Sequence, residues 1–584
     1  MTSSRLLAAA VALVVAWAAA PAHAAEFPDL APQTLGGYSA YTRYFDVRVG
    51  PGHDQQCTVV GDVYVPDGLA PDHRAPAILT SNGFGGSKDD QGGAAARFAA
   101  HGYVVLTYSG LGFGGSTCKI SFADPDYDGA AGSALIDYLA GDSASAYLDP
   151  ARTVPAPALD VVRLDSVGDP RVGYLGGSYA GATGLATASV DARLDTVASM
   201  ITWNDLARSL APDAGGASPV GAVKSIFGSG FLAAGAVLTG PSGYAADPAR
   251  ADDCPNYPRW VCAAAADFAA NRTPDPATLA ALRHASPADY LGRVNVPVLL
   301  AQGQKDSLFG LSEASATFRA LRARGIETSM IWHSWGHDDR KAAPGEFDIK
   351  APDPFTQHEA ALVGNWLDRH LKDRAAEPIP AFTYFRDWIP FTGSASPAYA
   401  ESQSFPVGTP TVLHLDDGML LQDNDKPGPW TRVLRGAGGP VPTTFGVPSV
   451  AGDSPIPRVS LPGGAVRWTG APLTGPVDVV GSPVLTIGPH TTGRCTVFVT
   501  LLDVGPDGIG RTIHGLAAPA VLTGAGTAVS VSLPGIVHRF DTGHRIAVEI
   551  TASDPSFAGG PGPADVTWAQ SDASNELSLP VVPS

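Results

Sequence analysis

Positive charge is scarce in this 584-residue chain. It has 38 lysines and arginines against 56 aspartates and glutamates, which gives a formal net charge of −18 at pH 7. Nucleic-acid binding depends on clustered lysine and arginine side chains that neutralise phosphates. The charge balance therefore argues against a nucleic-acid partner and is compatible with solubility outside the cell.

Long apolar runs are absent after the first 24 residues. Near the N-terminus, Arg5 precedes an almost purely apolar stretch at 6–20, and a small-residue motif follows at 21–24. This is the pattern of a secretory signal peptide, so we expect residues 1–24 to be removed by cleavage after Ala24. The alternative is a retained membrane anchor, but the stretch is shorter than the ~20 residues that a spanning helix needs. We expect a secreted, extracellular protein that has no membrane partner after this cleavage.

Cysteine is also rare, with five in the chain. In an exported protein cysteines favour disulfides, and an odd number leaves one over. Cys254 and Cys262 could close a local loop and Cys57 could pair with Cys118, which would leave Cys495 alone, but the sequence does not fix this connectivity. No Cys/His spacing matches a zinc site, so we predict no metal.

Short apolar runs alternate with helical stretches between about residues 57 and 372. This alternation is typical of a parallel α/β sheet covered by helices. A region at about 205–290 interrupts it and is predicted to be a helical cap over the sheet, although a surface excursion with no role in substrate choice is the alternative. The predicted strands are 57–65, 75–80, 103–108, 171–175, 196–203, 298–302 and 328–333, and the predicted helices are 92–101, 129–140, 180–189, 313–324 and 358–372.

After about residue 376 the long helical periods end. Short alternating segments separated by Gly, Pro and Asp turns take their place, which indicates an all-β sandwich of the jelly-roll type. Examples are 412–415, 465–468, 484–487, 496–504, 528–533 and 545–551. We therefore predict a catalytic α/β domain at 25–375 and a C-terminal β-sandwich at 376–584.

The strongest local signal lies at 172–181, where an apolar strand runs into a glycine-flanked turn and then a helix of small residues. This is the context of a nucleophile elbow, in which the serine backbone is strained and the residues two places away must be small. Gly176 meets this condition on one side of Ser178, whereas Ala180 stands where the strict pattern has glycine and Gly181 follows one place later. We predict that Ser178 is the nucleophile of an α/β-hydrolase.

A serine nucleophile needs a base to remove its proton, and the base needs an orienting acid. In this fold the acid and then the histidine follow the serine in the chain, each just beyond a strand. Asp306 follows the strand at 298–302 and His337 follows the strand at 328–333. Ser178, Asp306 and His337 are therefore the predicted catalytic triad.

Three other residues compete for these roles. His333 is a rival base, but we expect it to end its strand and pack. Glu313 and Asp338 are weaker rivals for the acid, because Glu313 lies on a predicted helix and Asp338 is adjacent to His337.

The tetrahedral intermediate of acyl transfer needs two preorganised donors for its oxyanion. One is expected to be the backbone N–H of Tyr179, directly after the nucleophile. The glycine-rich loop at 81–86 should supply the other, and Phe84 is the candidate. The alternative is that these glycines only form a turn. The loop does not fit a phosphate cradle, because no Gly-Lys-Ser/Thr motif opens a helix after it.

Together these segments resemble the Xaa-Pro dipeptidyl-peptidase and cocaine-esterase-like serine hydrolases. Residues 176–181 look like the family's Gly-x-Ser-Tyr-x-Gly elbow, 302–309 and 335–337 look like its acid and base segments, and 501–508 are similar to a strand and turn of its jelly-roll domain. The resemblance covers about residues 40 to 584. It implies hydrolysis of an acyl bond through an acyl-enzyme, with no metal and no organic cofactor.

The first loop departs from the family pattern. Family members often use a tyrosine hydroxyl in this loop as the second oxyanion donor, whereas residues 82–86 contain no tyrosine and are closer to the His-Gly-type loops of lipases and esterases. The departure leaves the choice between peptide and ester substrates open.

Two substrate hypotheses share this chemistry, and the leading one is an exported peptidase that acts at Xaa-Pro bonds. A dipeptidyl-peptidase acting at Xaa-Pro bonds needs a carboxylate for the substrate's α-ammonium and an apolar pocket for proline, and Trp203 and Asp205 are candidates for such a pocket, although Trp203 could equally only pack under the cap. The alternative is a carboxylesterase or amidase acting on small acyl substrates. A carbohydrate-binding jelly roll beside an inactive hydrolase is disfavoured, because all three triad residues are present in order. Nothing in the sequence predicts an oligomeric state.

Overall fold

The computed structural model describes most of the chain between residues 37 and 583. The residues in that range that it does not describe are 239, 271–272, 349–350, 352, 373–378, 423–428, 452–456, 525–527 and 570–574. The predicted signal peptide at residues 1–24 lies outside the described residues. In the described part of the chain, every helix is too short or too polar to cross a membrane.

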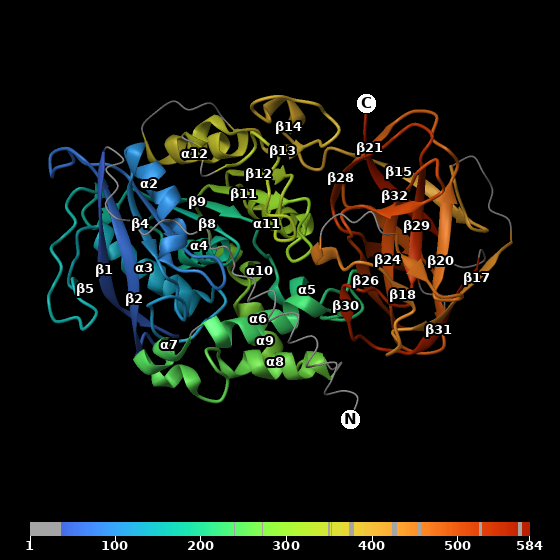
Figure 1. Cartoon of the computed structure of the whole chain (residues 1–584), viewed down its shortest axis with the longest axis horizontal. Helices are drawn as coiled ribbons and strands as arrows, with labels where there is room; N and C mark the ends of the chain where they lie inside the picture. Colours follow the sequence, from blue (N-terminus) through green and yellow to red (C-terminus); the bar gives the residue numbers. More distant parts are fainter. Residues whose placement is uncertain are drawn as a thin grey trace.

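An eleven-stranded sheet organises the first part of the chain (Figure 1). Its order is β14-β13-β12-β11-β9-β8-β3-β4-β2-β1-β5, and the strands from β13 to β4 in this order are parallel. These central strands are almost wholly buried, as expected for a parallel sheet covered on both faces. Their bounds are β1 Tyr38–Val49, β2 Gln55–Pro66, β3 Ala77–Ser81, β4 Val104–Tyr108, β5 Ala146–Tyr147, β8 Val172–Gly177, β9 Leu194–Met200, β11 Val298–Gly303, β12 Thr328–His333, β13 Phe382–Phe385 and β14 Tyr399–Ser402.

Helices cover both faces of this sheet. Apolar side chains alternate along the strands, so that Leu300 belongs to the same buried cluster as side chains of α3, α4 and α11, while Leu299 and Ile331 belong to a second cluster with side chains of α2 and α12. The bounds are α2 Gly92–Ala100, α3 Ala130–Leu139, α4 Tyr179–Val190, α11 Leu311–Ala323 and α12 His358–Leu371. The arrangement confirms the predicted α/β-hydrolase domain, and each predicted strand and helix overlaps an observed one, whereas strands β1, β5, β13 and β14 were not predicted.

The predicted domain boundary at residues 375 and 376 is wrong. Strand β13 pairs in parallel with β12, and β14 pairs antiparallel with β13, so the sheet of the first domain continues to Ser402. Both strands are only four residues long, and their place in the sheet depends on pairing, of β13 with β12 and of β14 with β13, rather than on a local pattern.

The segment between β9 and β11 forms helices in the region predicted to be a cap, and α6 to α9 lie at the bottom of the view in Figure 1. They are α5 Leu206–Leu210, α6 Ser225–Leu238, α7 Gly240–Ala246, α8 Arg259–Ala269, α9 Pro276–His284 and α10 Pro287–Tyr290. Cys254 and Cys262 form a disulfide in this segment, and Cys57 and Cys118 form another in the first domain. Cys495 is buried and has no disulfide partner.

The C-terminal part is a β-sandwich, on the right of Figure 1. A twelve-stranded sheet faces the three-stranded sheet β17-β31-β23, and Trp430, Trp468 and Trp568 pack edge to face in the core between them. Its strands are β15 Thr409–Asp416, β16 Met419–Leu421, β17 Thr431–Ala437, β18 Thr444–Phe445, β19 Val459–Ser460, β20 Ala465–Gly470, β21 Val477–Gly481, β22 Val484–Ile487, β23 His490–Thr491, β24 Cys495–Val504, β25 Gly510–Thr512, β26 Ala518–Leu522, β27 Val529–Ser532, β28 Ile536–Phe540, β29 Arg545–Thr551, β30 Phe557–Ala558, β31 Ala564–Ala569 and β32 Glu576–Val582. The predicted β-sandwich class is confirmed.

Candidate active site

Ser178 lies in the tight turn between strand β8 and helix α4. Its backbone has φ 56° and ψ −121°, a strained conformation for a residue with a side chain, and its N–H donates to the carbonyl of Met200 at 2.8 Å. A Cβ atom on Gly176 would lie 2.5 Å from the carbonyl of Ala180. Glycine at 176 therefore lets the helix start directly against the strand, with the half-buried serine at the turn.

Gly181 explains why the second glycine of the motif comes one place late. A Cβ atom on Gly181 would lie 2.9 Å from the carbonyl oxygen of Met200 and 3.0 Å from the hydroxyl of Ser199, so the first turn of α4 rests directly on β9. Ala180 is fully buried and its methyl group is accommodated. The close contact between α4 and β9 is thus at Gly181, the third residue after Ser178, and not at Ala180.

The three predicted triad residues meet beyond the carboxyl ends of β8, β11 and β12. His337 Nδ1 lies 2.6 Å from Asp306 Oδ2, and His337 Nε2 lies 2.9 Å from Ser178 Oγ. Asp306 is fully buried, and only 12% of the His337 side chain is exposed. A proton on Nδ1 donated to the carboxylate leaves Nε2 to accept the serine proton, as nucleophilic catalysis requires.

Two glycines let the loop that carries Asp306 (the acid loop) pack closely against the loop that carries His337 (the base loop). A Cβ atom on Gly303 would lie 2.0 Å from the carbonyl oxygen of Trp335, and one on Gly336 would lie 2.4 Å from the carbonyl oxygen of Lys305. Within the acid loop, the N–H groups of Leu308 and Phe309 donate to Asp306 Oδ1 at 3.1 and 2.8 Å. These bonds fix the carboxylate so that its other oxygen faces the imidazole.

The rival residues have other partners. His333 is the last residue of β12, is fully buried, and binds Glu359 through Nδ1 at 2.7 Å. Glu313 accepts the backbone N–H of Asn204 at 2.7 Å. Asp338 accepts both the N–H and the hydroxyl of Ser307, and burial raises its pKa to about 7.

The phenol of Tyr179 has a structural role that the sequence analysis missed. Its hydroxyl donates to Asp128 at 2.6 Å and accepts the N–H of Phe122 at 2.8 Å. Burial raises the pKa of Asp128 to about 6, although Tyr179, Ser121 and the N–H of Ala123 all donate to this carboxylate. This network holds Phe122 beside the elbow, and no sequence pattern marks it.

The two predicted oxyanion donors lie on adjoining segments. Tyr179 is the first residue of α4, so its N–H belongs to the positive end of the helix dipole. The Phe84 ring lies 6.4 Å from the Tyr179 ring and 5.4 Å from the Phe113 ring, measured between centroids. The loop that carries Phe84 is thereby placed against the elbow, as an oxyanion loop must be.

Aromatic side chains surround this site. The Phe309 ring lies 5.4 Å from the His337 ring and 5.2 Å from the Trp203 ring. From the cap, Trp260 lies 5.9 Å from Phe122. Trp203 is buried, donates to the carbonyl of Ala285 and packs 6.2 Å from Tyr179, so it belongs to this apolar wall.

Asp205, the other residue predicted for a substrate pocket, has different partners, and its part in such a pocket stays a prediction. Its carboxylate caps α5 by accepting the N–H of Arg208, whose guanidinium lies 3.8 Å away. It lines a cavity of about 590 Å³ between the α/β domain and the β-sandwich. Among the described residues that line this cavity are Asp306 and Ser307, but neither Ser178 nor His337.

One cluster in the described residues has the composition of a metal site. Asp124 and Asp126 lie 3.5 and 3.0 Å from His284 Nε2, and Asp289 lies 3.7 Å from His284 Nδ1. Although burial opposes it, the aspartates raise the pKa of His284. The cluster is therefore satisfied as an ion-pair network between the cap and the α/β domain.

Comparisons with known proteins agree with this geometry. The family model described as X-Pro dipeptidyl-peptidase (S15 family) matches residues 56–339, and the X-Pro dipeptidyl-peptidase C-terminal non-catalytic domain matches residues 457–570. A search of curated proteins found no match.

Several solved structures share the whole architecture. An aminopeptidase from the marine sediment archaeon Thaumarchaeota archaeon is 15% identical (TM-score 0.63), with 94% of this chain and 97% of that chain covered. An α-amino acid ester hydrolase is 14% identical (TM-score 0.59; 95% and 99% covered), and a CocE/NonD family hydrolase from Staphylococcus aureus is 13% identical (TM-score 0.61; 93% and 97% covered). At these identities the likeness establishes the fold.

Proposed function

Because this chain belongs to the X-Pro dipeptidyl-peptidase (S15) family of serine hydrolases, we propose that it cleaves an ester or peptide bond at Ser178 through a covalent acyl-enzyme. The observation that carries the proposal is the position of the His337 ring, which contacts Asp306 through one nitrogen and Ser178 Oγ through the other. This is the arrangement that turns a serine hydroxyl into a nucleophile.

The reaction follows from these contacts. His337 Nε2 takes the hydroxyl proton as Ser178 Oγ attacks the substrate carbonyl, and Asp306 stabilises the resulting imidazolium. The N–H of Tyr179 and an amide of the Phe84 loop are proposed to bind the oxyanion. His337 then protonates the leaving group, and water attacks the acyl-enzyme with His337 again acting as base.

The walls of the site support an apolar, uncharged acyl group. Trp203, Phe309, Phe122 and Trp260 offer aromatic surfaces near the nucleophile. The nearby carboxylate of Asp128 is engaged by internal donors. A small ester or amide with an apolar acyl group is therefore the first candidate substrate.

Release of an Xaa-Pro dipeptide is the second candidate. Both matching family models carry that description, and an aromatic wall also suits a proline ring. The two candidates differ in whether a charged substrate N-terminus contributes to binding.

We also propose that the protein is exported. The two disulfides support this location, because disulfides persist in oxidising compartments.

The test is kcat/KM for p-nitrophenyl esters of apolar acids beside Gly-Pro- and Ala-Pro-p-nitroanilide, each anilide with a free and a blocked N-terminus. We expect ester cleavage to dominate and to vanish in Ser178→Ala. Anilide cleavage that is lost on blocking the N-terminus would assign the protein to dipeptide release. Hydrolysis that persists in Ser178→Ala would refute the proposed nucleophile.

A further inference from the structure

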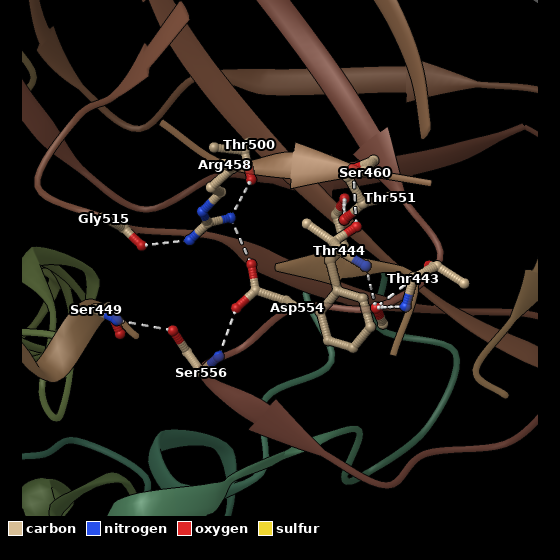
Figure 2. A network of polar contacts seen from close by, with 12 residues as sticks. Thr443, Thr444, Ser449, Arg458, Ser460, Thr500, Gly515, Thr551, Asp554 and Ser556 are labelled. Carbon is tan, nitrogen blue, oxygen red and sulfur yellow. Dashed lines mark hydrogen bonds and ion pairs between the residues drawn. The ribbon is translucent and has the colours of Figure 1, made fainter. Parts of the chain in front are cut away.

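A buried ion pair immobilises a loop of the β-sandwich that faces the α/β domain. Arg458 and Asp554 pair with their side chains 8% and 0% exposed, and Arg458 also donates to Thr500 Oγ1 and to the carbonyl of Gly515 (Figure 2). The second oxygen of Asp554 accepts the N–H of Ser556 at 2.8 Å. Because every group in the pair is satisfied, the loop at 554–557 is held rigidly.

This loop in turn fixes a short strand of the cap. The carbonyl of Ser556 accepts both the N–H and the hydroxyl of Ser225, at 3.1 and 3.0 Å. Strand β10 (Val223–Lys224) pairs antiparallel with β30, with Lys224 opposite Phe557. The β-sandwich therefore sets the backbone position of Lys224.

The side chain of Lys224 reaches the loop of the triad acid. Its Nζ donates to the carbonyl of Leu308 at 2.6 Å, and Leu308 and Phe309 are the residues whose N–H groups hold Asp306 Oδ1. The ammonium interacts electrostatically with Glu313, Asp306 and Asp338, and burial lowers its pKa. A half-buried lysine held among these acidic groups beside the triad is a candidate for a functional role.

We propose that Lys224 is a positioning residue for Asp306, and that the β-sandwich orders the catalytic acid through the Arg458–Asp554 pair, the Ser556 carbonyl and Lys224. The inference rests on the proposed function of the triad and adds a role in activity for the C-terminal domain. Lys224 holds the loop carbonyl, the loop amides hold the carboxylate, and the carboxylate aligns His337.

Loss of the ammonium has two expected effects. The released acid loop misaligns His337, so kcat falls 10- to 100-fold while KM changes less than about threefold. A positive charge beside the triad also disappears, so the protonated His337 ring becomes easier to form and the acid limb of kcat/KM moves to higher pH. Among the described residues, Glu313, Asp338, Asp128 and the Lys305–Asp339 pair also carry ionisable groups near the triad, and all remain in the variant.

The experiment compares Lys224→Met with Lys119→Met as a matched control. Lys119 also donates its ammonium to backbone carbonyls of the cap, those of Asp252 and Cys254, but these do not belong to the acid loop. We expect K224M to show the kcat loss and the shifted acid limb, K224R to restore most of both, and K119M to keep wild-type values.

If K224M does not fold, Ser225→Ala provides the test, because it removes one of the two bonds to the Ser556 carbonyl and should lower kcat about two- to fivefold with KM unchanged. An unchanged kcat and pH profile in folded K224M, or in S225A, overturns the inference while the proposed function stands. A wild-type enzyme that hydrolyses nothing overturns the proposed function, and this inference with it.

Discussion

Ser178 has a backbone conformation that side chains rarely adopt, and the residues around it are small where contact is closest. Strain of this kind persists only where surrounding structure imposes it, as the strand and helix do at this turn. At the same scale, the histidine that completes the site is distinguished from its neighbour by its partners: His337 contacts Ser178, whereas His333 contacts Glu359.

Asparagine substitutions should separate these two histidines. Asparagine can keep a donor near the position of Nδ1 but cannot replace Nε2, so His337→Asn should lower kcat by roughly 10³-fold or more. His333→Asn retains a donor to Glu359 and should stay within tenfold of wild type. Steady-state kinetics on the best ester substrate decide the matter, and a reversed order of the two variants would make His333 the base.

Asp195 predicts a pH dependence of stability. Burial, together with Asp165 and Asp169, raises its pKa to about 7, although it accepts the N–H of Val172. The unfolded chain loses this proton near pH 4 and the folded protein near pH 7, so this group's contribution to stability falls as pH rises between those values.

In Asp195→Asn the amide oxygen can still accept the Val172 N–H, and this pH-dependent contribution disappears. After allowance for solvent screening, the wild type should lose about 2 kcal/mol more than the variant between pH 4 and pH 8 in urea unfolding. If the free energy of unfolding changes with pH in parallel for the two proteins, Asp195 is not the source of this pH dependence.

At the scale of elements, the close approach of α4 to β9 at Gly181 shapes the elbow. Gly181→Ala forces a methyl group toward the Met200 carbonyl and should lower the free energy of unfolding by about 1–3 kcal/mol. The matched control is Ala180→Gly, which introduces no contact and should cost no more than about 1 kcal/mol. Denaturant unfolding measures the free energy of unfolding of both variants. An equal loss in Gly181→Ala and Ala180→Gly would contradict the packing argument.

Elements with local patterns were predictable from the sequence, and those defined by distant partners were not. Ser178, Asp306 and His337 each follow a buried apolar strand, and such strands are readable from composition. Strand β13 joined the sheet only through pairing with β12, and β14 only through pairing with β13. Asp128 acquires its role because the fold brings Tyr179 to it, and the capping of α5 by Asp205 could not be read from the sequence pattern.

At the scale of the whole molecule, the cap and the β-sandwich share buried hydrogen bonds. Asp213 of the cap segment accepts the N–H of Val521 in β26 at 2.9 Å, and also those of Gly215 and Ser218. Ala214 donates to the carbonyl of Pro519 at 2.8 Å. The two parts of the chain therefore stabilise each other.

Asp213→Ala should lower the free energy of unfolding by about 2–4 kcal/mol, because two buried N–H groups and a part-buried one lose their acceptor. The exposed Asp72→Ala should stay within about 0.5 kcal/mol of wild type. Calorimetric and tryptophan-fluorescence melts of the two variants provide the measurement. Equal melting temperatures would show that this contact does not join the domains.

The most direct test of the triad is fluorophosphonate labelling followed by peptide mass mapping of the mature protein. We predict a single adduct on Ser178, with labelling lost in Ser178→Ala and strongly slowed in His337→Asn. An adduct on another serine, or no adduct on a folded wild-type protein, would contradict the assignment of Ser178, Asp306 and His337 as a working triad.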